Sequence, residues 1–290
     1  MAIWCGIPDN PLVYGPVSRR YCSRSRERRR KSAMAASIST TTDARKGGSV
    51  VRITIDNPGK INVIGTQAME AMTAALREAS ADPELRAVVL AGAGEKAFIG
   101  GVDIAEMADL DPVSARALIQ TLHLVCVGIR ACPVPVIARM QGYTLGGGLE
   151  IAAACDMRVA AEGARFGMPE TRIGIPSVIE AALLPQLIGW GPTRRILFTG
   201  EIFGTREAER WGLVEEVVPL AELDAAVDRV VEDVLACGPR AIRLQKRLMQ
   251  QWEALPPGGA VQAGVECFVE SWRSPEPARM MADFLASKRK

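Results

Sequence analysis

Two glutamates are the residues of this chain whose setting most clearly predicts chemistry. Glu150 follows three consecutive glycines at 146–148, and Glu170 follows Pro169, so a special backbone feature precedes each carboxyl group. Two carboxyl groups that converge on one pocket can divide acid and base roles, because burial and mutual repulsion separate their pKa values. The pair therefore predicts proton transfer, and a glycine loop able to bind an oxyanion predicts that this transfer occurs beside a carbonyl group.

Two glycine loops stand where predicted strands lead into predicted helices. Gly100 and Gly101 precede a helix expected to start near Asp103, and residues 146–148 open another. Helix N-termini present unpaired N–H groups, and two such donors that face each other form an oxyanion hole. Neither loop matches the phosphate-binding pattern Gly-x-x-x-x-Gly-Lys-Ser/Thr, and no Gly-x-Gly-x-x-Gly follows a strand, which argues against a nucleotide site.

Strands and helices alternate in the part of the chain that must position these groups. Apolar runs predict strands over 50–55, 85–91, 134–140 and 158–161, and helical spacing predicts helices over 66–80, 115–130 and 148–155. This alternation is typical of an α/β fold with a parallel sheet covered on both faces. From residue 179 onward the pattern is helical, apart from a short strand over 214–218.

Charge is distributed unevenly along the 290-residue chain. Residues 1–33 carry a net charge of +6, whereas the remaining chain carries −4, so the body of the protein is not a basic nucleic-acid binder. We predict a disordered basic leader over residues 1–47. Three origins are open: an upstream start codon before Met34, an arginine-rich transit peptide, or an arm that touches nucleic acid. No apolar run reaches the length of a membrane span, so we expect no transmembrane segment.

Cysteine and histidine usage argues against several other chemistries. The seven cysteines include no Cys-x-x-Cys pair, which is typical of free thiols in a reducing compartment. His123 is the only histidine and is expected to pack inside a helix. A serine hydrolase would have only this one candidate base, and the chain has no nucleophile-elbow motif, which argues against that chemistry. A metal site is not predicted either, because suitable ligands are lacking.

A set of motifs in a fixed order resembles the crotonase superfamily, whose archetype is enoyl-CoA hydratase. The resemblance spans roughly residues 48–290. Its motifs are residues 57–62, 97–107, 135–138, 142–156, 166–176, 197–200 and 208–214.

The resemblance implies a crotonase-like spiral of ββα units over residues 48–200 and a helical C-terminal region over 201–290 that forms trimers or dimers of trimers. It implies an acyl-CoA thioester substrate and no separate cofactor, metal or membrane. Glu150 and Glu170 take the positions of the family's catalytic glutamates, and the N–H groups of Gly100 and Gly147 those of its oxyanion hole. The positions that resemble its CoA contacts are Lys60, Ile61, Asp103, Ile104, Phe284 and Lys288.

The reaction implied is the hydration of a trans-2-enoyl thioester. Glu150, as a carboxylate, takes a proton from the attacking water, and Glu170 delivers one to C2. The alternatives are an enoyl-CoA isomerase, another acyl-CoA lyase or hydrolase, and an RNA-binding relative that uses its basic arm. A departure from the family pattern follows Pro176, where Ser177 to Glu180 replace a glycine-rich stretch; we expect Glu180 to be an exposed or helix-terminal charge. The expected location is the cytoplasm, or the mitochondrial matrix if residues 1–33 are a transit peptide.

Overall fold

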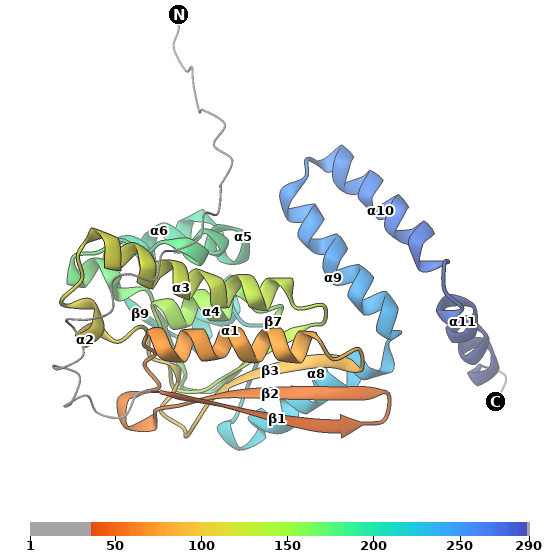
Figure 1. The fold of residues 1–290 in the computed structure, drawn as a ribbon, viewed down its shortest axis with the longest axis horizontal. Helices are drawn as coiled ribbons and strands as arrows, with labels where there is room; N and C mark the ends of the chain where they lie inside the picture. Colours follow the sequence, from red (N-terminus) through yellow and green to blue (C-terminus); the bar gives the residue numbers. More distant parts are fainter. Residues whose placement is uncertain (1–35, 289–290) are drawn as a thin grey trace, which may run out of the picture. The chain divides into compact units, whose positions relative to one another are not determined.

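The computed structural model describes residues 36–288, and these residues belong to one compact unit (Figure 1). The predictions for residues 1–33 therefore lie outside the described residues. The sequence-based boundary at residue 200 falls inside this unit.

The larger sheet has six strands in the order β1-β2-β3-β5-β7-β10. β1 runs antiparallel to β2, and the other neighbours are parallel, as predicted. The predicted limit of the leader at residue 47 is wrong, because β1 already pairs with β2 over its full length; its threonine-rich sequence suits an edge strand. The strands are β1 (Ser37–Arg45), β2 (Gly48–Asp56), β3 (Leu85–Gly92), β5 (Val136–Met140), β7 (Met157–Ala161) and β10 (Glu216–Val218).

The smaller sheet has the strand order β4-β6-β8-β9, in which β4, β6 and β8 are parallel. Consecutive strands alternate between the sheets: β3, β5 and β7 join the larger one, and β4, β6 and β8 the smaller one. Helices follow each such pair, which gives the repeated ββα arrangement. The strands are β4 (Ala97–Ile99), β6 (Tyr143–Leu145), β8 (Arg165–Gly167) and β9 (Ile202–Gly204).

Helices cover both faces of the larger sheet. On one face, α1 (Thr66–Ser80), α3 (Pro112–Ala131) and α4 (Gly147–Ala154) bury the main apolar core. On the other, α8 (Leu223–Ala236) packs on β3, β5 and β7. By length and composition α3 could cross a membrane, but Leu122, Val125 and Ile129 on one of its faces are buried in the core.

Three long helices end the chain: α9 (Pro239–Ala254), α10 (Pro257–Ser271) and α11 (Glu276–Ser287). α10 and α11 extend away from the sheets, and neither has a buried residue (Figure 1). The helical pattern predicted for this part of the chain is confirmed. The remaining helices are α2 (Ile104–Met107), α5 (Leu184–Ile188), α6 (Trp190–Thr199) and α7 (Thr205–Trp211), with 3-10 turns η2 (Pro58–Lys60), η3 (Pro169–Ile173), η4 (Ile179–Leu183) and η5 (Leu220–Glu222).

Candidate active site

Glu150 lies in the first turn of α4 and is almost completely buried, with 3 % of its surface exposed. Gly146 precedes the helix with a φ of 52°, which glycine adopts without strain. One carboxyl oxygen of Glu150, Oε1, accepts a hydrogen bond of 3.2 Å from the N–H of Ala181. Burial raises the pKa of Glu150 to about 8, and the charges of Glu170 and Glu180 act in the same direction.

Glu170 lies in η3, directly after Pro169. Its Oε2 accepts a hydrogen bond of 2.9 Å from the hydroxyl of Ser177, and burial raises its pKa. A Cβ atom on Gly146 would lie only 2.4 Å from Oε1 of Glu170, so this carboxyl group rests on the turn that leads into Glu150. The structure therefore brings the two glutamates into one site.

The glycine turn has to consist of glycines because other chain segments lie against it. A Cβ atom on Gly148 would lie 2.2 Å from the carbonyl oxygen of Ile99, which no side chain could fit. Gly147 is the first residue of α4, and its N–H therefore belongs to the group of helix donors that have no partner within the helix. Gly147 thus has the geometry expected of an oxyanion-hole donor.

The N–H of Gly100, the second expected oxyanion-hole donor, has a partner within the chain. Its N–H donates a hydrogen bond of 2.8 Å to the carbonyl of Ile61, so this donor is already occupied in the structure. Ile61 and Asn62 have positive φ values of 51° and 54°, conformations rarely adopted by a β-branched residue such as Ile61. The buried Asn62 side chain fixes the segment, since it accepts from the N–H of Asn57 and donates to the carbonyls of Ala93 and Ala97.

The expected CoA contacts near Gly100 lie together. The Lys60 ammonium and Asp103 carboxylate are 3.6 Å apart. Asp103 also caps α2, because its side chain accepts a hydrogen bond of 2.9 Å from the N–H of Ala105. Ile104 is largely exposed, and Ile61 packs against Gly100. These residues form one partly exposed edge beside the glycine loop.

Phe284 and Lys288 belong to a different region. Phe284 is exposed on α11, and the Lys288 ammonium lies 5.5 Å from the centre of its ring. α11 is separated from α4 in Figure 1, so within one protomer the structure does not bring these two residues to the glutamates.

Glu180 was expected to be exposed or at a helix terminus, and the prediction of exposure is wrong. It lies in η4 with 7 % of its surface exposed. Its Oε1 is 2.8 Å from Nδ1 of His123, a residue expected only to pack inside its helix. Sequence reasoning also missed the contacts of Ser177 and Ala181 to the two glutamates. The available signal was the replacement of the family's glycine-rich stretch at these positions.

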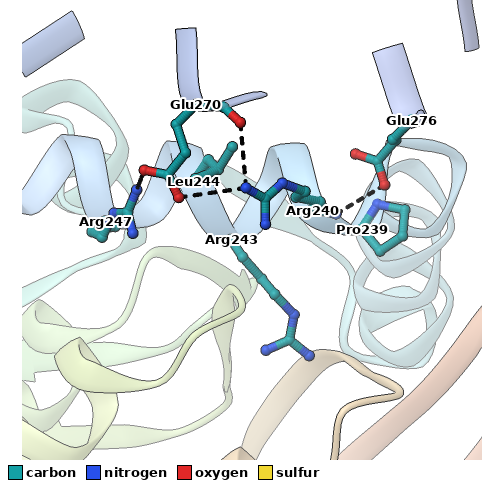
Figure 2. A pocket seen from close by; sticks show the side chains of 7 residues that line it. All are labelled: Pro239, Arg240, Arg243, Leu244, Arg247, Glu270 and Glu276. Atoms are coloured by element: carbon teal, nitrogen blue, oxygen red, sulfur yellow. Dashed lines mark hydrogen bonds and ion pairs between the residues drawn. The ribbon is translucent and has the colours of Figure 1, made fainter. Parts of the chain in front are cut away.

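A separate pocket lies where α9 approaches α10 and α11, and its lining includes three arginines (Figure 2). Arg240 and Arg247 both contact the carboxylate of Glu270. Arg243 donates to the carbonyls of Pro83 and Leu85, at 3.0 and 2.9 Å. Arg240 and Arg247 thus tie α9 to α10, and Arg243 ties α9 to the start of β3.

The cysteines that the structure describes are free thiols, and Cys126, Cys132 and Cys155 are buried. Among residues 36–288, no cluster of three or more histidine, cysteine, aspartate or glutamate side chains is arranged to hold a metal ion.

Comparison with known proteins gives a consistent result. The profile of the family described as Enoyl-CoA hydratase/isomerase matches residues 45–274. The chain is 33% identical to a short-chain-enoyl-CoA hydratase of Clostridium acetobutylicum over 84% of this chain and 94% of that protein. It is 36% identical to a crotonyl-CoA hydratase of Syntrophomonas wolfei over 66% of this chain and 74% of that protein.

The fold leads to the same group. The crystal structure of an enoyl-CoA hydratase from Bacillus anthracis matches with a TM-score of 0.81 and 29% identity, over 86% of this chain and 96% of that one. The alternation of strands between two sheets is therefore the crotonase fold, as expected. The chain belongs to the enoyl-CoA hydratase/isomerase family of the crotonase superfamily.

Proposed function

We propose that this protein is an enoyl-CoA hydratase that adds water across the 2,3 double bond of a short trans-2-enoyl-CoA. The observation that carries the proposal is the meeting of the buried Glu150 carboxyl group with the partly buried Glu170 carboxyl group at the Gly146 turn. The names of the relatives, a short-chain-enoyl-CoA hydratase and a crotonyl-CoA hydratase, support the same substrate class.

The glutamate pair shares one proton in the reactive form. A water molecule held between the carboxyl groups attacks C3, the ionised glutamate takes a proton from it, and the protonated glutamate delivers a proton to C2. Since Glu150 is the more deeply buried, it holds the shared proton in the resting site. Glu150 acts as the base only when this proton resides on Glu170 as the water attacks. The shared water transfers the proton from Glu150 to Glu170.

Negative charge that grows on the thioester oxygen is stabilised by backbone donors. Gly147 N–H, at the start of α4, supplies one hydrogen bond and the positive end of the helix dipole. Gly100 N–H supplies the second once the Ile61 carbonyl moves aside and the thioester oxygen takes its place. Each such donor contributes about 3 kcal/mol to transition-state stabilisation. Lys60, Asp103 and Ile104 line the side from which the CoA arrives.

The proposed assembly is a trimer or a dimer of trimers. α10 and α11 expose large apolar side chains, among them Phe268, Trp272 and Phe284, and a partner subunit that covers them would bring Phe284 and Lys288 to a neighbouring CoA site. The reaction needs no cofactor beyond the CoA of its substrate. We place the enzyme in the cytoplasm, in keeping with its bacterial relatives.

The direct test is hydration of crotonyl-CoA by the purified protein, followed by loss of the enone absorbance. We expect turnover by the native protein and a loss of at least about 100-fold in kcat for Glu150→Gln and for Glu170→Gln. Glu70→Gln is the matched control, because it removes one carboxylate from the exposed face of α1 and should leave kcat unchanged.

Two results would contradict the proposal. Full activity in both active-site variants would remove the assigned roles. Conversion of a 3-enoyl-CoA without hydration of crotonyl-CoA would identify the protein as an isomerase.

A further inference from the structure

Glu180 is a buried acid with an incomplete set of partners. η4, which carries it, packs against both α3 and α4. Its Oε1 is 2.8 Å from Nδ1 of His123, while its Oε2 is buried and contacts no hydrogen-bond partner among the described residues. A buried carboxyl oxygen without a partner is costly, so its presence calls for a compensating role.

Glu180 lies beside the catalytic pair. The residue after it, Ala181, donates its N–H to Glu150, so the same 3-10 turn holds the Glu150 carboxyl group and carries the third acid. Cys126 on α3 lies close to both acids: burial raises the pKa of its thiol most, and the charges of Glu180 and Glu150 raise it further. α3, α4 and η4 therefore bring three buried acidic groups, those of Cys126, Glu150 and Glu180, into one region.

The other titratable groups around this region are few. Among the described residues they are His123 and Cys126 from α3, Cys155 after α4, and Glu170 from η3. The His123 ring is half-exposed, whereas Glu180 and Glu150 are both buried. A negative charge on Glu180 therefore acts on the pair through low-dielectric surroundings, where like charges repel strongly.

We propose that Glu180, anchored by His123, is a positioning residue of this site whose charge keeps one proton on the Glu150–Glu170 pair. Two like charges in a buried site disfavour a third, so the pair retains its shared proton to higher pH than two glutamates alone. At the same time η4 fixes the direction of Glu150 through the Ala181 N–H. The inference rests on the proposed two-glutamate chemistry, and its test includes one measurement that needs no substrate.

The kinetic measurement is the pH profile of kcat/KM for crotonyl-CoA in the native protein, Glu180→Gln and Glu180→Asp. Glutamine keeps the size of the side chain and removes its charge, whereas aspartate keeps the charge. We expect the alkaline midpoint of Glu180→Gln to fall by at least about half a pH unit, which is a threefold change in the protonation equilibrium. Glu180→Asp should retain the native midpoint.

The substrate-free measurement is the titration of carboxyl ¹³C signals in protein labelled at glutamate. The signal that disappears in Glu150→Gln belongs to Glu150, and its midpoint should fall in Glu180→Gln by the same amount. This titration remains decisive if the protein does not hydrate crotonyl-CoA, so failure of the proposed function and failure of the Glu180 role are told apart.

An unchanged midpoint in Glu180→Gln, with activity lowered equally at all pH values, would overturn the inference and leave Glu180 a packing residue. A shift of equal size in Glu180→Asp would also overturn it, because shape rather than charge would then be the cause. Glu70→Gln, on the exposed face of α1, controls for the loss of one charge and should leave both midpoints in place.

Discussion

Raising the pH should switch this enzyme off near pH 8, because the reactive form of the glutamate pair carries one proton. Burial raises the pKa of Glu150 to about 8, so it is the group of the pair that holds the last proton. A raised pKa of an acid means that the protonated form persists below that pH and is lost above it. The loss of activity therefore lies on the alkaline side.

The magnitude follows from the pKa. With a midpoint of about 8, the proton is retained by about nine-tenths of the sites at pH 7 and by about one-tenth at pH 9. Between these pH values kcat/KM should fall about tenfold. Since kcat/KM reports the free enzyme, it refers to the same ligand-free site that the structure describes.

The assay is initial-rate hydration of crotonyl-CoA between pH 5.5 and 10, at substrate concentrations well below KM. An incubation at each pH, followed by return to pH 7, separates titration from irreversible loss of the folded protein. A kcat/KM that keeps rising through pH 9 would refute the reasoning, since the reactive pair would then have to carry no proton. The pH midpoint of kcat/KM belongs to the coupled glutamate pair as a whole and not to either carboxyl group alone.

Three further predictions concern the glycine turn, the segment at residues 57–62 and the subunit interface. Gly146→Ala should lower kcat at least about tenfold, because its Cβ displaces the Glu170 carboxyl group. Gly163 also has a positive φ, but a Cβ there would point into open space, so Gly163→Ala should retain kcat. Asn62→Ala should lower the free energy of unfolding by about 2–4 kcal/mol, because it leaves the carbonyls of Ala93 and Ala97 without this partner. The measurement is unfolding in denaturant. An unchanged denaturant midpoint would show that this side chain does not fix the segment at residues 57–62. Phe268→Asp on the exposed face of α10 should reduce the mass measured by light scattering to that of smaller species, and an unchanged mass would place the subunit interface elsewhere.

The α/β class and the order of elements could be predicted from local sequence. Mostly apolar runs, each interrupted by one arginine, mark β3 and β5 because parallel strands are buried on both faces. Helical spacing of methionines and a leucine marks α1. The edge strand β1 was missed because it is mostly exposed and polar, so its sequence lacks the apolar alternation that marks a strand.

The candidate site divides in the same way. Glu150 and Glu170 could be selected from sequence because glycines and a proline mark the backbone before them. The two glutamates meet at Gly146, and the Gly100 N–H donates to the Ile61 carbonyl. Both contacts join segments that approach one another only in the folded chain.

The sequence alone determined which residue types were available for chemistry and which elements carry them, because propensity, periodicity and glycine placement act over a few neighbouring residues. Only the tertiary structure decided how those residues are charged. Glu180 was expected to be an exposed or helix-terminal charge, and it is a buried acid in the first turn of η4. Its burial depends on the packing of α3 against η4, which brings together His123 and Glu180 although they are 57 positions apart in sequence. Electrostatic environment is a property of what surrounds a group in space, and no local pattern records it.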